Sequence, residues 1–296
     1  MKIGYKTSLG TCYESSIEDF IRSKKAADLR GKVNLIFTSP PFPLNRKKKY
    51  GNLQGVEYID WLTEICRSLS STLTDDGSLV IEVGNSWDAG NPTMSTLSLE
   101  ALISIKRNTG LYLCQQFIWY NTAKLPSPVQ WVNIDRIRVK DSYTHIWWFA
   151  KTTLPKANNA KVLTEYSESM KKLLRRGKYN SGKRPSEHAI GTTSFLKENK
   201  GAIPSNVLVS SNTDSSHAYF TYCKENNFEL HPARMPREIP TFFIKFLTDE
   251  GDLILDPFAG SNTTGESAEA LNRKWICIEI NNEYIKGSKG RFLKPA

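Results

Sequence analysis

Asp256-Pro257-Phe258-Ala259-Gly260-Ser261-Asn262-Thr263-Thr264 stands directly after the apolar run Leu253-Ile254-Leu255 and before a segment with helical spacing. A turn of small residues between a buried strand and a helix brings backbone N–H groups and a helix N-terminus close to an anionic group such as a carboxylate. Glu279 follows at the end of the next apolar run, where an acid commonly accepts hydrogen bonds from ribose hydroxyls. Together these features predict an adenosine-type cofactor across the carboxyl ends of two adjacent strands.

Each of these features also has a purely structural interpretation. Gly260 would then only permit a tight turn, and Glu279 would be a surface acid. Either feature alone fits that interpretation, whereas their pairing weighs against it. The turn lacks the pattern G-x-G-x-x-G, which makes a dinucleotide the less suitable ligand.

Apolar runs and helical patterns alternate along most of the chain. This alternation predicts an α/β fold, with a mostly parallel sheet and helices on its faces. Residues 152–230 break the pattern with Lys-, Asn-, Ser- and Gly-rich sequence, and we expect an inserted lobe there, between parts 1–151 and 231–296. The predicted strands are 33–38, 78–83, 113–120, 143–150, 253–256 and 275–279, and the predicted helices are 58–69, 97–107, 242–247 and 263–271.

A second motif, Ser39-Pro40-Pro41-Phe42, ends the predicted strand 33–38. The prolines fix φ and remove N–H donors, so this turn is rigid and rich in hydrogen-bond acceptors. The Ser39 hydroxyl and the Pro40 carbonyl are suited to orient an amine that accepts a methyl group, and Phe42 offers a flat face for a stacked base. The alternative is a proline-rich strand terminator with an ordinary aromatic residue behind it.

The composition describes a basic globular protein. Its 296 residues allow one large α/β domain with an inserted lobe, or two small domains. Forty Lys and Arg against thirty Asp and Glu give a net charge of +10, which is typical of nucleic-acid binders but also of many other proteins. The five widely spaced cysteines, with no CxxC pair, predict neither a disulfide framework nor a metal site. Because no membrane-length apolar run and no secretory signal is present, we expect a cytoplasmic protein.

Two segments concentrate basic residues. Arg46, Lys47, Lys48 and Lys49 lie just beyond Phe42, and residues 171–184, which include Lys183 and Arg184, carry seven basic residues and no acid. Such runs are usually solvated faces. Beside a pocket for a nucleic-acid base they instead suit contacts to phosphates and, from the inserted lobe, to base edges in the major groove.

The two motifs together resemble the catalytic and S-adenosylmethionine motifs of amino-DNA methyltransferases. Ser39 before Pro-Pro, in place of Asp or Asn, resembles the branch that methylates N4 of cytosine. Because the catalytic motif precedes the cofactor motif, the chain resembles the circularly permuted β class, as found in type II restriction-modification systems. The resemblance runs over almost the whole chain, through the strings 5–11, 50–53, 124–128, 131–133, 137–141 and 231–234.

This resemblance implies a Rossmann-like S-adenosylmethionine-dependent methyltransferase fold, circularly permuted, with 152–230 as the target-recognition lobe. Residues 1–151 then form the catalytic part and 231–296 the cofactor-binding part. The family also implies that double-stranded DNA is the partner and that the target cytosine is flipped into the site. Residues around the cofactor are then Asp256, Phe258, Gly260, Ser261, Asn262 and Thr263, with Glu279 on the ribose and Ser39, Pro40, Pro41 and Phe42 at the target base.

Some alternatives stay open at this point. An N6-adenine methyltransferase is the nearest rival, since both amines are chemically alike; the others are a catalytically silent DNA-binding protein and an RNA methyltransferase. One departure from the family is Glu14-Ser15-Ser16, which replaces a string expected to meet the adenine. The resemblance further implies a bacterial enzyme that protects DNA from a cognate endonuclease without stable association, with CAGCTG as the first duplex to test.

Overall fold

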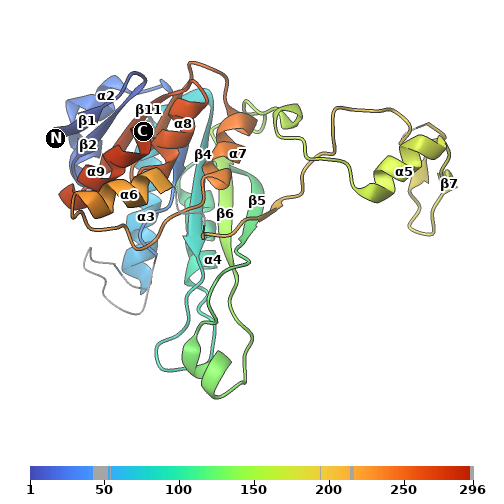
Figure 1. The fold of residues 1–296 in the computed structure, drawn as a ribbon, viewed down its shortest axis with the longest axis horizontal. Helices are drawn as coiled ribbons and strands as arrows, with labels where there is room; N and C mark the ends of the chain where they lie inside the picture. Colours follow the sequence, from blue (N-terminus) through green and yellow to red (C-terminus); the bar gives the residue numbers. More distant parts are fainter. Residues whose placement is uncertain (43–52, 54, 194, 214–216, 294–296) are drawn as a thin grey trace. The chain divides into compact units, whose positions relative to one another are not determined.

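Figure 1 shows a computed structural model of the chain, which describes residues 1–42, 53, 55–193, 195–213 and 217–293. The chain divides into a larger unit, 1–157 with 206–296, and a smaller unit, 158–205. The larger unit contains β1 (Lys2–Lys6), β2 (Gly10–Glu14), α1 (Ile17–Arg22), α2 (Lys24–Asp28), β3 (Val33–Thr38), α3 (Gly55–Ser70), β4 (Leu73–Gly84), α4 (Leu97–Asn108), β5 (Tyr112–Tyr120), η1 (Gln130–Ile134), β6 (Tyr143–Ala150), β9 (Val207–Val209), α6 (His217–Glu225), α7 (Glu238–Leu247), β10 (Leu253–Asp256), α8 (Thr263–Ala270), β11 (Lys274–Glu279), α9 (Asn282–Ser288) and η3 (Lys289–Phe292).

The centre of the larger unit is one sheet of the order β1-β2-β11-β10-β3-β4-β6-β5-β9. The neighbouring strands β2, β11, β10, β3 and β4 run parallel to one another. Their carboxyl ends therefore meet at one edge of the sheet. This is the edge at which α/β folds bind their ligands.

Most of the described strand pairings are parallel, as the sequence predicts, but the sheet is mixed. β6 is antiparallel to both β4 and β5, and β1 is antiparallel to β2. No helical crossover of the βαβ kind separates β5 from β6, so β6 returns alongside β5 in the opposite direction. β4 also begins earlier than the predicted strand 78–83, because residues 75–77 form a bulge within the strand, between the pairs Val33–Leu73 and Leu35–Ser78.

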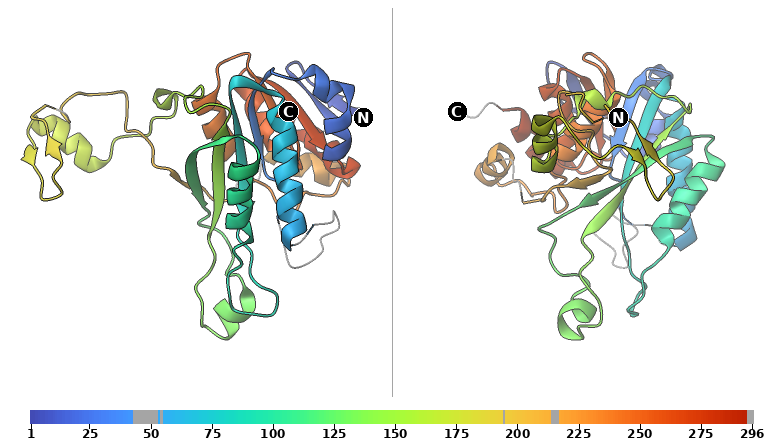
Figure 2. Two further views of the ribbon diagram at one scale, coloured as in Figure 1. Left: turned by 180° about the vertical axis from the view of Figure 1, so that it is seen from behind. Right: turned by 90° about the vertical axis from the view of Figure 1, so that its right-hand side faces the viewer.

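Alternating side chains of the central strands fill two apolar cores, one on each face of the sheet. On β11, Ile276 and Ile278 belong to the core covered by α1, α3 and α4, whereas Trp275 and Cys277 belong to the core covered by α7, α8 and α9 (Figures 1 and 2). α7 contributes Phe243, whose ring lies 5.0 Å from that of Phe117 on β5. Helices on both faces hold the strands rigidly, and thereby fix the edge where the functional turns emerge.

The smaller unit contains η2 (Asn159–Lys161), α5 (Glu168–Arg176), β7 (Gly182–Lys183) and β8 (Ala189–Ile190). Ser167 caps the start of α5 by accepting a hydrogen bond from the N–H of Met170, and Gly177, in the left-handed region, ends it. Among its described residues only Gly201 is buried. A segment without a core of its own leaves most of its side chains exposed, where a partner or water can contact them.

The smaller unit is shorter than the expected lobe 152–230. Residues 206–230 belong to the larger unit because β9 pairs with β5 and α6 packs against η3 and α9. Lys156, near the other boundary, forms ion pairs with Asp249 and Asp252, both 2.7 Å from its Nζ. Backbone pairing and ion pairs therefore attach both flanks of the expected lobe to the main sheet.

Two loops extend together beyond the carboxyl edge of the sheet (Figures 1 and 2). Residues 121–142 join β5 to β6, and residues 85–96 follow β4; we call the pair the arm. Trp87 from one loop packs on Trp131 from the other, with ring centroids 5.6 Å apart. No helix within the described ranges has both the length and the apolarity that a membrane crossing requires.

Candidate active site

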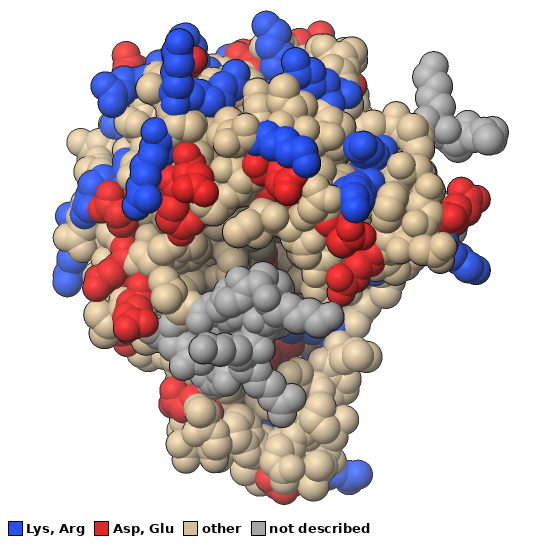
Figure 3. All heavy atoms as spheres, turned by 90° about the vertical axis from the view of Figure 1, so that its left-hand side faces the viewer, with Lys and Arg blue, Asp and Glu red and all other residues tan. Residues whose placement is uncertain are grey.

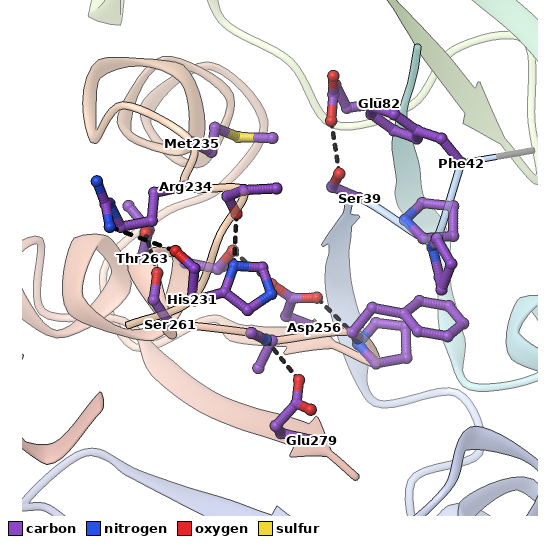
Figure 4. A pocket seen from close by; sticks show the side chains of 18 of the residues that line it. Ser39, Phe42, Glu82, His231, Arg234, Met235, Asp256, Ser261, Thr263 and Glu279 are labelled. Carbon is purple, nitrogen blue, oxygen red and sulfur yellow. Dashed lines mark hydrogen bonds between the residues drawn. The ribbon is translucent and has the colours of Figure 1, made fainter. Parts of the chain in front are cut away.

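A cavity of about 800 Å³ opens at the carboxyl edge of the sheet. Its walls come from the ends of β3, β4, β10 and β11 and from residues 231–235, which approach from the segment before α7 (Figure 4). Both motifs of the sequence analysis therefore meet in one cavity, although more than 200 residues separate them. The residues predicted to contact the cofactor or the target base that line it are Ser39, Pro40, Pro41, Phe42, Asp256, Phe258, Gly260, Ser261, Thr263 and Glu279.

Asp256 organises the turn that follows β10. One of its carboxylate oxygens accepts hydrogen bonds from the Thr38 hydroxyl at 2.8 Å and from the Phe258 N–H at 3.0 Å. The other accepts from the Thr264 hydroxyl at 2.6 Å. Burial raises the pKa of Asp256, and these three donors oppose that rise. Asp256 thus fixes the shape of the turn and also joins it to the end of β3.

Glu279 holds the same turn from the neighbouring strand. Its Oε2 accepts the N–H of Gly260 at 2.7 Å, and its Oε1 accepts the N–H of Asn281 at 2.8 Å. Burial raises the pKa of this carboxyl, and the two N–H donors oppose the rise. A carboxylate has about four acceptor positions, so each oxygen retains capacity for a hydroxyl donor from the cavity.

Gly260 adopts φ +52°, in the left-handed region where a side chain is strained. A Cβ at this position would stand 2.9 Å from Nε2 of His231. The His231 ring is held in turn by a 2.6 Å hydrogen bond between its Nδ1 and the carbonyl of Ala233, and by edge contact with the Tyr284 ring. The His231 ring, which lines the cavity, therefore lies close to the backbone of the turn at Gly260.

Asn262 is the one predicted cofactor residue that lies outside the cavity lining formed by the described residues. It is fully buried, and its side chain caps α8 by accepting the N–H of Gly265 at 3.0 Å. Its amide also donates to the Tyr5 hydroxyl at 2.8 Å. The side chain of Asn262 thus bonds to other parts of the fold and stabilises the turn from the side away from the cavity.

The turn after β3 presents Ser39 to the cavity beside an unexpected partner. The Ser39 hydroxyl donates a 2.5 Å hydrogen bond to Oε2 of Glu82, an acid on the central strand β4 (Figure 4). Phe42 follows three residues later, and a Cβ on Gly84 would meet its ring at 2.6 Å. Gly84 therefore leaves the space at the end of β4 that the Phe42 ring occupies.

Glu82 is only 3% exposed. Burial raises its pKa to about 7, against the opposing effects of the Ser39 hydrogen bond and of the nearby Lys124 charge. A carboxyl with that pKa exchanges protons near neutral pH. Such perturbed groups in a cavity mark candidate sites for proton transfer.

With this geometry in place, the comparisons with known proteins are decisive. A family model for DNA methylases of the N6 and N4 type matches residues 33–290. Over 294 residues the chain is 43% identical to the type II methyltransferase M.PvuII of Proteus hauseri. This match covers 99% of this chain and 86% of the relative.

The chain belongs to the N6/N4 DNA methylase family. The solved structure of the PvuII DNA methyltransferase (cytosine-N4-specific) matches this methylase with a TM-score of 0.79 and 37% identity, over 99% of this chain and 89% of the other. The structure of the M1.HpyAVI–SAM complex has the same fold, with a TM-score of 0.57 and 18% identity, over 96% of this chain and 99% of the other.

Two of the predicted DNA-contacting residues of the methylase, Lys183 and Arg184, are described, and neither lines the cavity. Lys183 and Arg184 belong to the smaller unit, where both are exposed. Arg46, Lys47, Lys48 and Lys49 lie outside the described residues. Contacts of these residues with DNA stay a prediction.

Sequence reasoning missed Glu82, Asn121, Lys124 and Trp61, all of which line the cavity of the methylase. Glu82 did leave a signal, because an acid within the apolar run Ser78–Val83 is unusual for a central strand buried on both faces. The others lie on a helix and in a loop with no distinctive spacing. Only the folded sheet brings them to the same edge.

The buried carboxyl of Glu82 makes stability depend on pH. Its raised pKa means that the folded chain binds this proton more tightly than the unfolded chain, so stability falls as pH rises towards about 7. Relative to Glu82→Gln, we expect the free energy of unfolding of the wild type to fall by on the order of 2 kcal/mol between pH 5 and pH 8. Urea denaturation of both proteins measures the difference, and parallel pH profiles would contradict it.

Proposed function

We propose that this chain is a site-specific DNA methyltransferase that transfers the methyl group of S-adenosylmethionine to N4 of cytosine. The observation that carries the proposal is the shared cavity, which holds the acceptor-rich turn Ser39–Phe42 and the turn Asp256–Thr264 on adjacent strands. The likeness to the cytosine-N4-specific PvuII enzyme supports the choice of base.

The residues around the second turn fit S-adenosylmethionine. Glu279 offers acceptor capacity for ribose hydroxyls, and the left-handed glycine at Gly260 lets the backbone of the turn come close to the cavity. Trp61 and Phe258, whose ring centroids lie 5.7 Å apart, form an apolar wall suited to the adenine. When bound, the cofactor supplies an electrophilic methyl group on a sulfonium.

Ser39 orients the cytosine amine. Because the Ser39 hydroxyl donates its hydrogen bond to Glu82, the lone pairs of its oxygen remain available to accept an N4–H. The Pro40 carbonyl accepts the other N4–H, Pro41 keeps the turn rigid, and Phe42 stacks on the base. The N4 proton released on methylation has a near acceptor in Glu82, through Ser39.

The target cytosine leaves the helix stack to reach this cavity. Its N4 lies inside a base pair in duplex DNA, so transfer within the stack is blocked. The smaller unit is the target-recognition lobe in this account, with the basic side chains of α5 and of Lys183 and Arg184 available to phosphates and base edges. The motif order along the chain corresponds to the circularly permuted β class.

The proposed reaction on DNA also suggests where the enzyme acts and what it protects. We place the enzyme in a bacterial cytoplasm, where it protects host DNA from a cognate endonuclease that acts on the same sequence without stable association. N6-adenine is the second candidate target, because the family model covers both N6 and N4 enzymes.

Nucleoside mass spectrometry tests the reaction. Duplexes that contain CAGCTG are incubated with the protein and S-adenosylmethionine with a labelled methyl group, and labelled N4-methylcytosine is expected. Ser39→Ala should lower turnover by at least about 100-fold while calorimetry shows unchanged cofactor affinity, because the Ser39 hydroxyl serves the amine and Glu82 and not the cofactor. Labelled N6-methyladenine, or full activity of the variant, would contradict the assignment.

Cofactor affinity tests the turn at Gly260. Gly260→Ala adds a Cβ beside His231 at a left-handed residue, and we expect S-adenosylmethionine to bind at least about tenfold more weakly by calorimetry. Gly110→Ala is the matched control, since Gly110 also has positive φ but no atom of the described residues within 4 Å of its added Cβ. Equal losses of affinity in both variants would assign the effect to general strain.

The pH dependence of turnover tests Glu82. Its ionised form accepts the Ser39 proton, so kcat/KM should rise with pH through about 7, as the free enzyme loses the Glu82 proton. In Glu82→Gln this step should disappear and turnover should be low throughout. A rise of the same size in the variant would show that another group controls it.

A further inference from the structure

The arm exposes apolar side chains, although hydrogen bonds within the arm hold its backbone in place. Leu125 is 79% exposed and Val139 is 86% exposed, and Val129, Ile134 and Ile137 in the same loop are also exposed. Isolated exposed apolar residues are ordinary, but a concentration of them on one projection marks an interaction surface. In Figure 3 the lower projection of the molecule is mostly free of charged side chains.

The two sides of the 121–142 loop lie next to each other near the base of the arm. The N–H of Asp141 donates to the carbonyl of Ser127 at 3.1 Å, and Nζ of Lys140 lies 3.4 Å from the carbonyl of Lys124. Lys124 also forms an ion pair of 3.7 Å with Asp141. Leu125 and Val139 are the direct chain neighbours of Lys124 and Lys140, so they lie on the two facing sides of the arm, near its base.

The second loop of the arm secures this geometry. Asn85, directly after β4, donates to the Asp141 carboxylate at 3.0 Å, and Arg138 donates to the carbonyl of Pro92 at 3.0 Å. The arm is therefore preorganised rather than a loop free to fold back on its apolar side chains. A surface held open in this way is ready for a partner.

The base of the arm is continuous with the cavity of the active site. Asn121 and Lys124 line the cavity, as do Tyr143 and Thr144 at the start of β6. Leu125 follows Lys124 directly in the chain, so it lies next to a residue that lines the cavity. Arg136 and Lys140 add positive charge along the same loop, which suits a polyanion.

We propose that Leu125 and Val139 form an apolar wedge that enters duplex DNA beside the target pair and fills the space left by the extruded cytosine. This inference rests on the proposed function. Proteins that unstack DNA insert apolar side chains between base steps, and extrusion leaves such a space. Arg136 and Lys140 then face phosphates of the flanking duplex.

The experiment compares two duplexes that differ only at the target pair. In one the target cytosine is paired with guanine, and in the other it is mispaired with adenine, which lowers the cost of extrusion. Leu125→Ala with Val139→Ala should lower kcat/KM at least about tenfold on the paired duplex and less than about twofold on the mispaired one. Leu154→Ala is the matched control, because Leu154 is 86% exposed but follows the other end of β6.

The outcomes separate the wedge from other roles. Unchanged calorimetric affinity for S-adenosylmethionine confirms that the double variant is folded. Equal losses on both duplexes, or no loss on the paired duplex, would overturn the wedge. Absence of N4-methylcytosine with the wild-type protein would instead overturn the proposed function, independently of the arm.

Discussion

The hydrogen bond from Thr38 to Asp256, 2.8 Å long, joins the ends of the two strands on which the rest of the site depends. Thr38 is the last residue of β3 and Asp256 the last of β10, so this bond fixes the start of both functional turns relative to each other. One turn then presents Ser39 and the other presents Gly260. Parallel pairing of β3 with β10 makes the bond possible, and helices on both faces keep these strands in place.

The same edge of the sheet concentrates buried acids. Burial raises the pKa of Glu82, Asp256 and Glu279, which shows that each carboxylate is less stable here than in water. Specific hydrogen-bond donors stabilise each carboxylate: the Ser39 hydroxyl for Glu82, two hydroxyls and an N–H for Asp256, and backbone N–H groups for Glu279. Stability is therefore reduced at the place where a rigid, polar cavity is needed.

Sequence reasoning predicted the α/β class, the principal strands and both functional turns, because these depend on local signals. The apolar runs before Ser39 and Asp256 and the small residues around Gly260 are such signals. The antiparallel β6, the burial of Asn262 against Tyr5 and the contact of Glu82 with Ser39 depend on partners far along the chain. Such pairings follow from the sheet order, which local patterns do not determine.

A crystal structure of the protein with a duplex and a non-reactive analogue of S-adenosylmethionine tests the central claim most directly. The account predicts that the target cytosine is extruded into the cavity, with N4 within hydrogen-bonding distance of Ser39 Oγ and the Pro40 carbonyl, and with the analogue beside Gly260 and Glu279. A cytosine that stays stacked in the duplex, or an amine held by other residues, would contradict it.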